Sequence, residues 1–252
     1  MIVAIMAGGL GKRMNSTKPK VLHSVFNTNG AFLPMIIHVI NTAIQLNPDK
    51  ILIIVGQYFD IIRHEIDIYI TPQNIEKYIQ YVHQDYPSGT GDAIKSCLPF
   101  LLSNSKCLIL SGDVPLISLE TLNSLIQSNN TILITELNNP SGCGRIMFSN
   151  QGDICKIIEE KDCSSEEKKI KFVNCGIYSI YTNDLHQYIP LINNSNKNNE
   201  YYLTDIVDLL VIDHQIIKPV ILDVENQYSI KNVNTSEDLM ELNNYILSMI
   251  EK

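Results

Sequence analysis

Glycines and basic residues are concentrated near the start of the chain, in the segment Met6-Ala-Gly-Gly-Leu-Gly-Lys-Arg-Met-Asn-Ser-Thr-Lys-Pro-Lys20. The glycines at positions 8, 9 and 11 have no Cβ to shield their backbone N–H groups, so an anionic ligand can approach the main chain closely. Arg13, Lys18 and Lys20 supply the positive charge that a polyphosphate requires. This pattern predicts a phosphate-binding loop.

The loop matches neither of the two common nucleotide fingerprints. A Rossmann dinucleotide fingerprint requires a third glycine where Met14 stands, and a P-loop requires glycine at Met6 and Ser or Thr at Arg13. A phosphate loop of a third kind is therefore expected. A tight turn with solvated charges is the alternative, because a glycine-rich loop alone does not exclude it.

A second chemical signal is Asp113, in the sequence Gly-Asp-Val-Pro-Leu that follows the apolar run 107–110. A carboxylate directly after a buried strand has no packing role. Mg²⁺ is a hard cation that proteins hold with one or two carboxylates while substrate phosphates complete its shell. Together with the opening loop, Asp113 predicts a magnesium site, whereas Asp113 alone would be read as a turn or capping residue.

Strand-like and helix-like segments alternate through the first half of the chain. Apolar runs predict buried strands at 2–6, 51–55, 79–82 and 107–110, and helical spacing predicts helices at 36–44, 61–68, 92–102 and 119–128. Such alternation predicts an α/β fold with a Rossmann-like, doubly wound, mostly parallel sheet. Ligands bind beyond the carboxyl ends of the strands in these sheets. The opening loop, Gln84 and Asp113 all fall at such ends.

The second half of the chain has more strands than helices. Strand-like segments at 132–136, 145–148, 154–159 and 172–181 predict a mixed region that walls one side of the site, and 237–250 predicts a terminal amphipathic helix. We therefore expect one nucleotide-binding unit over residues 1–230. The segment 231–252 is expected to pack on this unit or to extend from it.

Composition restricts the possible partners. The chain has 252 residues, 45% of them apolar, which suits one α/β domain with a sizeable core. The formal net charge of −8 argues against a nucleic acid or an acidic membrane surface as partner. A phosphate ligand must therefore be attracted by local cations.

The cysteines and the apolar runs indicate the compartment. Six cysteines, at positions 97, 107, 143, 155, 163 and 175, include no Cys-x-x-Cys pair, so reduced thiols are expected. The chain enters its first strand without the pattern of a signal peptide. No apolar run approaches the ~20 residues that span a bilayer. These features predict a cytoplasmic protein without a membrane partner.

Motifs along the chain, taken in order, resemble one enzyme family. The motifs are Ala-Gly-Gly-x-Gly-x-Arg-Met from Ala7, Lys-Pro-Lys-Val-Leu-His from Lys18, Gly-Thr-Gly from Gly89, Gly-Asp-Val-Pro-Leu from Gly112, Gly142–Ile146, Ile158–Asp162, Asn174–Ile177, Asn199–Asp205 and Val233-Asn234. The set resembles the sugar-phosphate nucleotidyltransferases. It is most similar to the uridyltransferase domain of the bacterial bifunctional N-acetylglucosamine-1-phosphate uridyltransferases, over nearly the whole chain.

The resemblance implies roles on the nucleotide side. It assigns recognition of uracil to Ala7, Gly8, Gly9, Gln84, Gly89 and Thr90. A carboxamide offers a donor and an acceptor together, so Gln84 can pair with the edge of a pyrimidine. Arg13 and Lys20 would hold the triphosphate and stabilise the departing pyrophosphate. Asp113 and Asn234 would bind Mg²⁺.

The resemblance also implies the sugar site and the reaction. Gly144, Glu159 and Asn174 would hold the amino sugar, with Glu159 facing hydroxyl groups and Asn174 facing the acetamido group. An oxygen of N-acetylglucosamine 1-phosphate would attack the α-phosphorus of UTP, producing UDP-N-acetylglucosamine and pyrophosphate. A phosphate monoester has a second pKa near ~6 and needs no general base. A solvated strand end remains the alternative for Glu159, and a turn residue for Asn174.

The chain departs from the family pattern in several places. It ends at Lys252, so the acetyltransferase β-helix of the bifunctional members, and the trimer that the β-helix builds, are expected to be absent. Gly8 stands where alanine is usual, and the connection Asn27–Leu33 is unusual. Asp92 stands where alanine or histidine is common, and we expect it to cap a helix.

Two other functions remain open on the sequence. One is a nucleotidyltransferase for another pair of substrates, such as glucose 1-phosphate or dTTP, because Gln84 and Thr90 do not separate uracil from thymine. The other is a nucleotide-sugar sensor without catalysis. The presence of Arg13, Lys20 and Asp113 favours an enzyme over a sensor.

Overall fold

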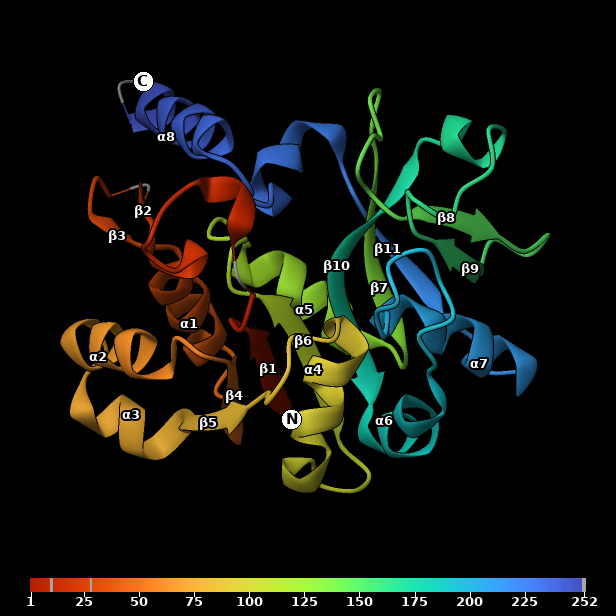
Figure 1. Ribbon diagram of the computed structural model, residues 1–252, viewed down its shortest axis with the longest axis horizontal. Helices are drawn as coiled ribbons and strands as arrows, with labels where there is room; N and C mark the ends of the chain where they lie inside the picture. Colours follow the sequence, from red (N-terminus) through yellow and green to blue (C-terminus); the bar gives the residue numbers. More distant parts are fainter. Residues whose placement is uncertain (10, 28, 251–252) are drawn as a thin grey trace.

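A computed structural model describes residues 1–9, 11–27 and 29–250 of the chain (Figure 1). Within these residues, nine strands form one sheet, seven of them in the continuous order β11-β7-β10-β6-β1-β4-β5. Their bounds are β1 Ile2–Met6, β4 Lys50–Val55, β5 Ile79–His83, β6 Lys106–Ser111, β7 Thr131–Glu136, β10 Phe172–Tyr181 and β11 Lys218–Leu222.

The N-terminal half of the sheet is parallel. β1 lies between β4 and β6, and β5 extends the sheet beyond β4, all with parallel pairing. The chain therefore moves from β1 outward to β4 and β5 on one side and then returns to β6 on the other. The gap between the loops after β1 and β6 is the topological switch point, where doubly wound folds bind ligands.

The second half of the sheet is mixed. β10 is antiparallel to both β6 and β7, and β11 is parallel to β7. Two further strands, β8 (Arg145–Phe148) and β9 (Ile154–Ile158), form an antiparallel pair that joins the sheet where β8 contacts β10. This pair projects from the main sheet and carries Gly144 and Glu159 at its ends.

Helices cover both faces of the sheet because its central strands are apolar on both sides. In β1, Val3 and Ile5 belong to one core layer, while Ile2 and Ala4 belong to the other. The first layer is covered by α1 (Met35–Gln45), α2 (Phe59–Tyr69), α3 (Pro72–Tyr78) and α5 (Leu119–Gln127). The second is covered by α4 (Thr90–Cys97), α6 (Thr182–Tyr188) and α7 (Ile206–Ile212).

None of the helices in the described part of the chain has the length and apolarity that crossing a membrane requires.

A third, smaller core joins the two ends of the chain. The hairpin of β2 (Ser24–Phe26) and β3 (Phe32–Pro34) packs against the terminal helix α8 (Ser236–Ile250), which lies beside it in Figure 1. Val25 and Met35 are fully buried against Leu242 and Ile246. Asn243 adds a bond by accepting from the backbone N–H of Phe26 at 3.0 Å. This core anchors the segment that leads into α8.

The predicted doubly wound, mostly parallel sheet is confirmed, and each strand and helix expected from apolar spacing is present. The pairing of β2 with β3 and the helices α3, α6 and α7 were not anticipated. A start signal for α3 was available, because Thr71 caps it and Pro72 follows at its first position. The division into 1–230 and 231–252 stays a prediction, and positions 251–252 and Thr28, within the Asn27–Leu33 connection, lie outside the described residues.

Candidate active site

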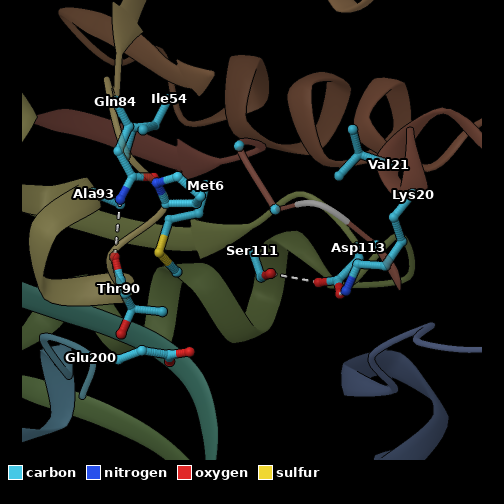
Figure 2. Close-up of a pocket in the computed structure, with 15 residues that line it drawn as sticks. Met6, Lys20, Val21, Ile54, Gln84, Thr90, Ala93, Ser111, Asp113 and Glu200 are labelled. Carbon is cyan, nitrogen blue, oxygen red and sulfur yellow. Dashed lines mark hydrogen bonds and ion pairs between the residues drawn. The ribbon is translucent and has the colours of Figure 1, made fainter. Parts of the chain in front are cut away.

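A cavity of about 450 Å³ opens beyond the carboxyl ends of β1, β5 and β6, at the topological switch point (Figure 2). Three segments predicted from the sequence to carry chemistry line this cavity. They contribute Gly8, Gly9, Gly11 and Lys20 from the opening loop, Gln84, Gly89 and Thr90 from the segment after β5, and Ser111 and Asp113 from the end of β6. The structure thus brings together residues that are up to 105 positions apart (8 to 113).

Charged and amide groups meet at one end of this cavity. Lys20 Nζ forms an ion pair with Asp113 and donates to Asn234 Oδ1 at 3.1 Å. Arg13 Nη2 donates to the same Asn234 oxygen at 2.9 Å. We call Arg13, Lys20, Asp113 and Asn234 the phosphate cluster. Direct contacts therefore link the four residues in the order Arg13, Asn234, Lys20, Asp113.

Asp113 is the most constrained member of the phosphate cluster. Its side chain is only 3% exposed, against 17% for that of Lys20. Ser111 Oγ donates to its carboxylate, and Asn232 Nδ2 lies 3.4 Å from it. Its backbone carbonyl accepts from the N–H of Val233 at 3.2 Å. A buried carboxylate with these partners keeps a fixed position.

Gly11 explains how Lys20 reaches the cluster. Gly11 has a φ of 58°, and a Cβ placed on it would lie 2.8 Å from the Cβ of Lys20. Only glycine allows this left-handed turn and this close return of the chain together. The glycine that the sequence suggested for phosphate contact therefore also shapes the loop.

Gln84 lies at the opposite end of the cavity and is buried, at 8% exposure. Its amide Nε2 donates to the carbonyl of Gly89 at 3.2 Å and to Asp92 Oδ2 at 2.9 Å. Because both amide hydrogens are used, the group left for a ligand is the carbonyl oxygen. The sequence had suggested a donor and an acceptor together, and the contacts reduce this to an acceptor.

The segment 88–91 is fixed by backbone pairing with a distant part of the chain. Tyr201 N donates to the carbonyl of Ser88, and the carbonyl of Tyr201 accepts from Gly91 N, both at 2.8 Å. The hydroxyl of Thr90 accepts from Leu203 N at 2.9 Å. Thr90 therefore uses its side chain to hold residues 201–203 beside the cavity.

The three predicted sugar residues also converge. A Cβ placed on Gly144 would lie 3.5 Å from Glu159 Oε1 and 3.6 Å from the Cβ of Asn174. Asn174 N donates to the carbonyl of Gly144 at 2.9 Å. The sequence separates these residues by up to 30 positions (144 to 174), and the junction of β8, β9 and β10 joins them.

Asn174 has a structural task as well. Its oxygen accepts from Gly176 N at 3.0 Å and its Nδ2 donates to the hydroxyl of Tyr178 at 2.6 Å, across a bulge where Gly176 has a φ of 73°. The turn interpretation of Asn174 is therefore supported. One amide hydrogen of Asn174 is not engaged in these two bonds.

A second cavity, of about 570 Å³, extends from Asn174 and Cys143 to Arg13 and Asn234. Its wall opposite β10 is formed by residues 227–241, which lead into and begin α8. Arg13 and Asn234 line this second cavity, while Lys20 and Asp113 line the first. The phosphate cluster therefore lies between the two cavities.

Residues 2–225 match the family described as Nucleotidyl transferase. The chain belongs to this family. It is 42% identical over 247 residues to a "Probable UDP-N-acetylglucosamine pyrophosphorylase" of Acanthamoeba polyphaga mimivirus, with 95% of this chain and 93% of that protein covered. It is 37% identical over 249 residues to the "Bifunctional protein GlmU" of Legionella pneumophila, and there it spans 51% of the relative's length.

A solved structure supports the fold of this nucleotidyl transferase. A UDP-glucose pyrophosphorylase complexed with UDP-glucose superposes with a TM-score of 0.76 over 98% of both chains, at 17% identity. At this identity the likeness concerns the fold alone. The Rossmann-like sheet predicted for nucleotide-sugar transferases is thereby confirmed.

The donor set of the nucleotidyl transferase fits a hard divalent cation. Asp113 and Asn234 direct oxygen atoms at the same positive atom, Lys20 Nζ. Carboxylate and amide oxygens are the ligands that Mg²⁺ prefers. Among the described residues, no three His, Cys, Asp or Glu side chains gather as a metal site. Substrate phosphates would therefore have to supply further ligands.

Several residues at the site were missed by sequence reasoning. Ser111 and Asn232 contact Asp113, Thr204 Oγ1 donates to Glu159 Oε1 at 3.0 Å, and Glu200 lines the first cavity. Ser111 and Asn232 each lie two positions from a predicted site residue. In an extended chain, side chains two positions apart lie on the same side. This spacing could have identified Ser111 and Asn232 from the sequence.

Glu159 lies in an environment that disfavours its charge. Burial raises the pKa of its carboxyl group, and the nearby acidic Asp162 and Glu200 act in the same direction, while the hydrogen bond from Thr204 opposes them. Behind it, Arg145, 1% exposed, forms a 2.6 Å ion pair with Glu160. This buried ion pair fixes the backbone from which Glu159 extends.

Replacing Gly89 by alanine should weaken nucleotide binding. Gly89 has a φ of 122°, and an added Cβ would lie 2.4 Å from the carbonyl oxygen of Tyr201. We expect UTP affinity, measured by calorimetry, to fall about tenfold or more, since backbone strain and a backbone clash combine. Gly152→Ala is the control, because Gly152 has a φ of 85° but open space around it. Equal UTP affinities in the two variants would contradict this account.

Glu159→Gln should stabilise the protein at neutral pH. The raised pKa means that ionised Glu159 costs stability, and this cost appears as pH rises through the folded-state pKa. We expect a higher Tm than wild type at neutral pH and a difference that shrinks toward pH ~4.3, where free glutamate is half protonated. Glu166→Gln, at a side chain that is 82% exposed, is the control. A Tm difference independent of pH would refute the assignment.

Proposed function

We propose that this chain is a UDP-N-acetylglucosamine pyrophosphorylase, which transfers UMP from UTP to N-acetylglucosamine 1-phosphate and releases pyrophosphate. The observation that carries the proposal is the position of the phosphate cluster between two cavities. A nucleotide in the first cavity and a sugar phosphate in the second would both direct their phosphates at Arg13 and Lys20.

The nature of each cavity supports this division of substrates. The first offers a buried acceptor on Gln84 and exposed backbone at Gly8 and Gly9, which suit a pyrimidine base and phosphates. The second includes Asn174, which lies beside Gly144 and Glu159. The name of the mimiviral relative, a probable UDP-N-acetylglucosamine pyrophosphorylase, favours the uridine nucleotide and the N-acetylamino sugar.

The reaction requires positioning more than acid–base chemistry. A non-bridging oxygen of the sugar phosphate forms a bond to the α-phosphorus, and the bond from that phosphorus to the oxygen bridging to the β-phosphate breaks. Pyrophosphate leaves with that bond's electron pair. The sugar phosphate is already largely dianionic at neutral pH, since its second pKa is near ~6. Holding both reactants in line is the main task of the protein.

The phosphate cluster would supply the electrostatic part. Arg13, which is exposed, and Lys20, which is half-buried, would neutralise charge on the triphosphate and on the departing pyrophosphate. Asp113 and Asn234 would hold Mg²⁺, which when bound adds positive charge against the phosphates. Ser111 and Asn232 would keep the Asp113 carboxylate in place.

Pyrophosphate release tests the function directly. The purified protein is assayed with Mg²⁺ and a grid of nucleoside triphosphates and sugar 1-phosphates. We expect the highest kcat/KM for UTP with N-acetylglucosamine 1-phosphate. Preference for glucose 1-phosphate would overturn the sugar assignment, and absence of turnover with every pair would favour a sensor.

Asp113→Asn should reduce the turnover number by about 10²- to 10³-fold, a typical cost of losing one electrostatic group at a reaction centre. The variant keeps the shape of the side chain but removes the charge that faces Lys20. The assay is pyrophosphate release across a titration of Mg²⁺. Asp67→Asn is a control, because Asp67 is exposed and pairs with Arg63 on α2. A wild-type rate at saturating Mg²⁺ would remove Asp113 from the reaction.

A further inference from the structure

Asp92 does not have the role that its position in the sequence suggests. We expected it to cap the helix that follows Gly-Thr-Gly. In the structure Gly89 is the N-cap of α4, without a side-chain capping bond, and Asp92 lies in the first turn. Its carboxylate accepts instead from the side-chain amide of Gln84, at 2.9 Å. The helix therefore presents Asp92 to the base-binding end of the cavity.

Asp92 and Gly89 together determine which way the Gln84 amide faces. The Asp92 carboxylate and the Gly89 carbonyl are both acceptors, and both receive hydrogen bonds from Gln84 Nε2. Turning the amide over would direct Gln84 Oε1 at two other oxygen atoms, one of them charged. Because a bond to a carboxylate is stronger than one between neutral groups, Asp92 supplies most of this preference.

The orientation leaves the oxygen of Gln84 toward the cavity. A Cβ placed on Gly8 would lie 3.4 Å from Gln84 Oε1, so this oxygen lies against the Gly8 wall of the nucleotide cavity. Figure 2 shows Gln84 at this end, on the far side of the cavity from Lys20 and Asp113. A ligand in the cavity therefore meets an acceptor held in one orientation.

An acceptor at this position distinguishes the pyrimidine bases. Uracil and thymine carry an N3–H donor between two carbonyl groups, whereas cytosine carries an unprotonated N3, which is an acceptor. A free glutamine could turn its amide to suit either edge. A glutamine whose two N–H groups are already bonded can only accept.

We propose that Asp92 is a positioning residue that sets the base specificity of the site, by holding the Gln84 amide so that it accepts N3–H of uracil or thymine and rejects cytosine. The proposal rests on the proposed function in so far as the first cavity binds the base of a nucleoside triphosphate. It adds a residue that would act on the choice of base through Gln84.

The test compares UTP with CTP in the Asp92→Asn variant. Asparagine has the same shape, but its amide can pair with the Gln84 amide in either orientation, so that only the Gly89 carbonyl still opposes the turned-over orientation of Gln84. We expect the ratio of kcat/KM for UTP to that for CTP to fall about tenfold, the usual worth of one hydrogen bond to a charged group. The ratio for UTP to dTTP should not change, because both bases carry N3–H.

Two controls separate positioning from a general structural effect. Ser96→Ala removes a hydroxyl that donates to the backbone carbonyl of Asp92 and leaves the side-chain contact intact; the UTP-to-CTP ratio should stay at the wild-type value. Asp92→Ala, which removes the acceptor entirely, should lower the ratio in the same direction. If Asp92→Asn is too unstable to assay, Asp92→Ala decides.

Calorimetric binding of UTP and CTP, without sugar phosphate, separates this proposal from the proposed function. Selective UTP binding that Asp92→Asn relaxes supports the proposal even if no sugar phosphate is turned over. A wild-type UTP-to-CTP ratio in both Asp92 variants overturns it while leaving the pyrophosphorylase function intact. Failure of the wild-type protein to bind UTP overturns both.

Discussion

The ion pair between Lys20 and Asp113 is the interaction on which the site depends. It joins the loop after β1 to the end of β6, across the switch point of the sheet. Asn234 adds the segment before α8 by accepting from Lys20 and Arg13. Three parts of the chain thus meet through one ion pair and two hydrogen bonds donated by cations, in a protein whose net charge is −8. The local arrangement of Arg13 and Lys20, and not the net charge of the chain, makes this part of the protein suitable for a phosphate group.

The fold was largely predictable because each core element carries its own periodicity. The parallel strands are continuous apolar runs such as 51–55, and the helices repeat apolar residues at helical spacing. The hairpin of β2 and β3 lacked such a signal, since three-residue strands are too short to show alternation. Its stability comes from packing against α8, more than 200 residues away in sequence, which no local pattern reveals.

The sequence predicted which candidate residues come together, whereas it did not predict their hydrogen-bond partners. Ordered motifs located Arg13, Lys20 and Asp113, and the structure places them together as expected. Hydrogen-bond partners could not be read in the same way, because they depend on the direction of each side chain. Asp92 is the clearest case. Its position at the start of a helix suggested that its side chain caps the helix. In the structure its carboxylate instead accepts a hydrogen bond from the buried side-chain amide of Gln84.

The pairing of residues 88–91 with 201–203 also links the first cavity to the surroundings of Glu159. Thr90 holds Leu203, and the next residue, Thr204, donates to Glu159 on the sugar side. One short stretch of backbone therefore contacts both the wall of the first cavity and the carboxylate of Glu159, a predicted sugar residue. A substitution that shifts the backbone at 203–204 would therefore alter both contacts at once.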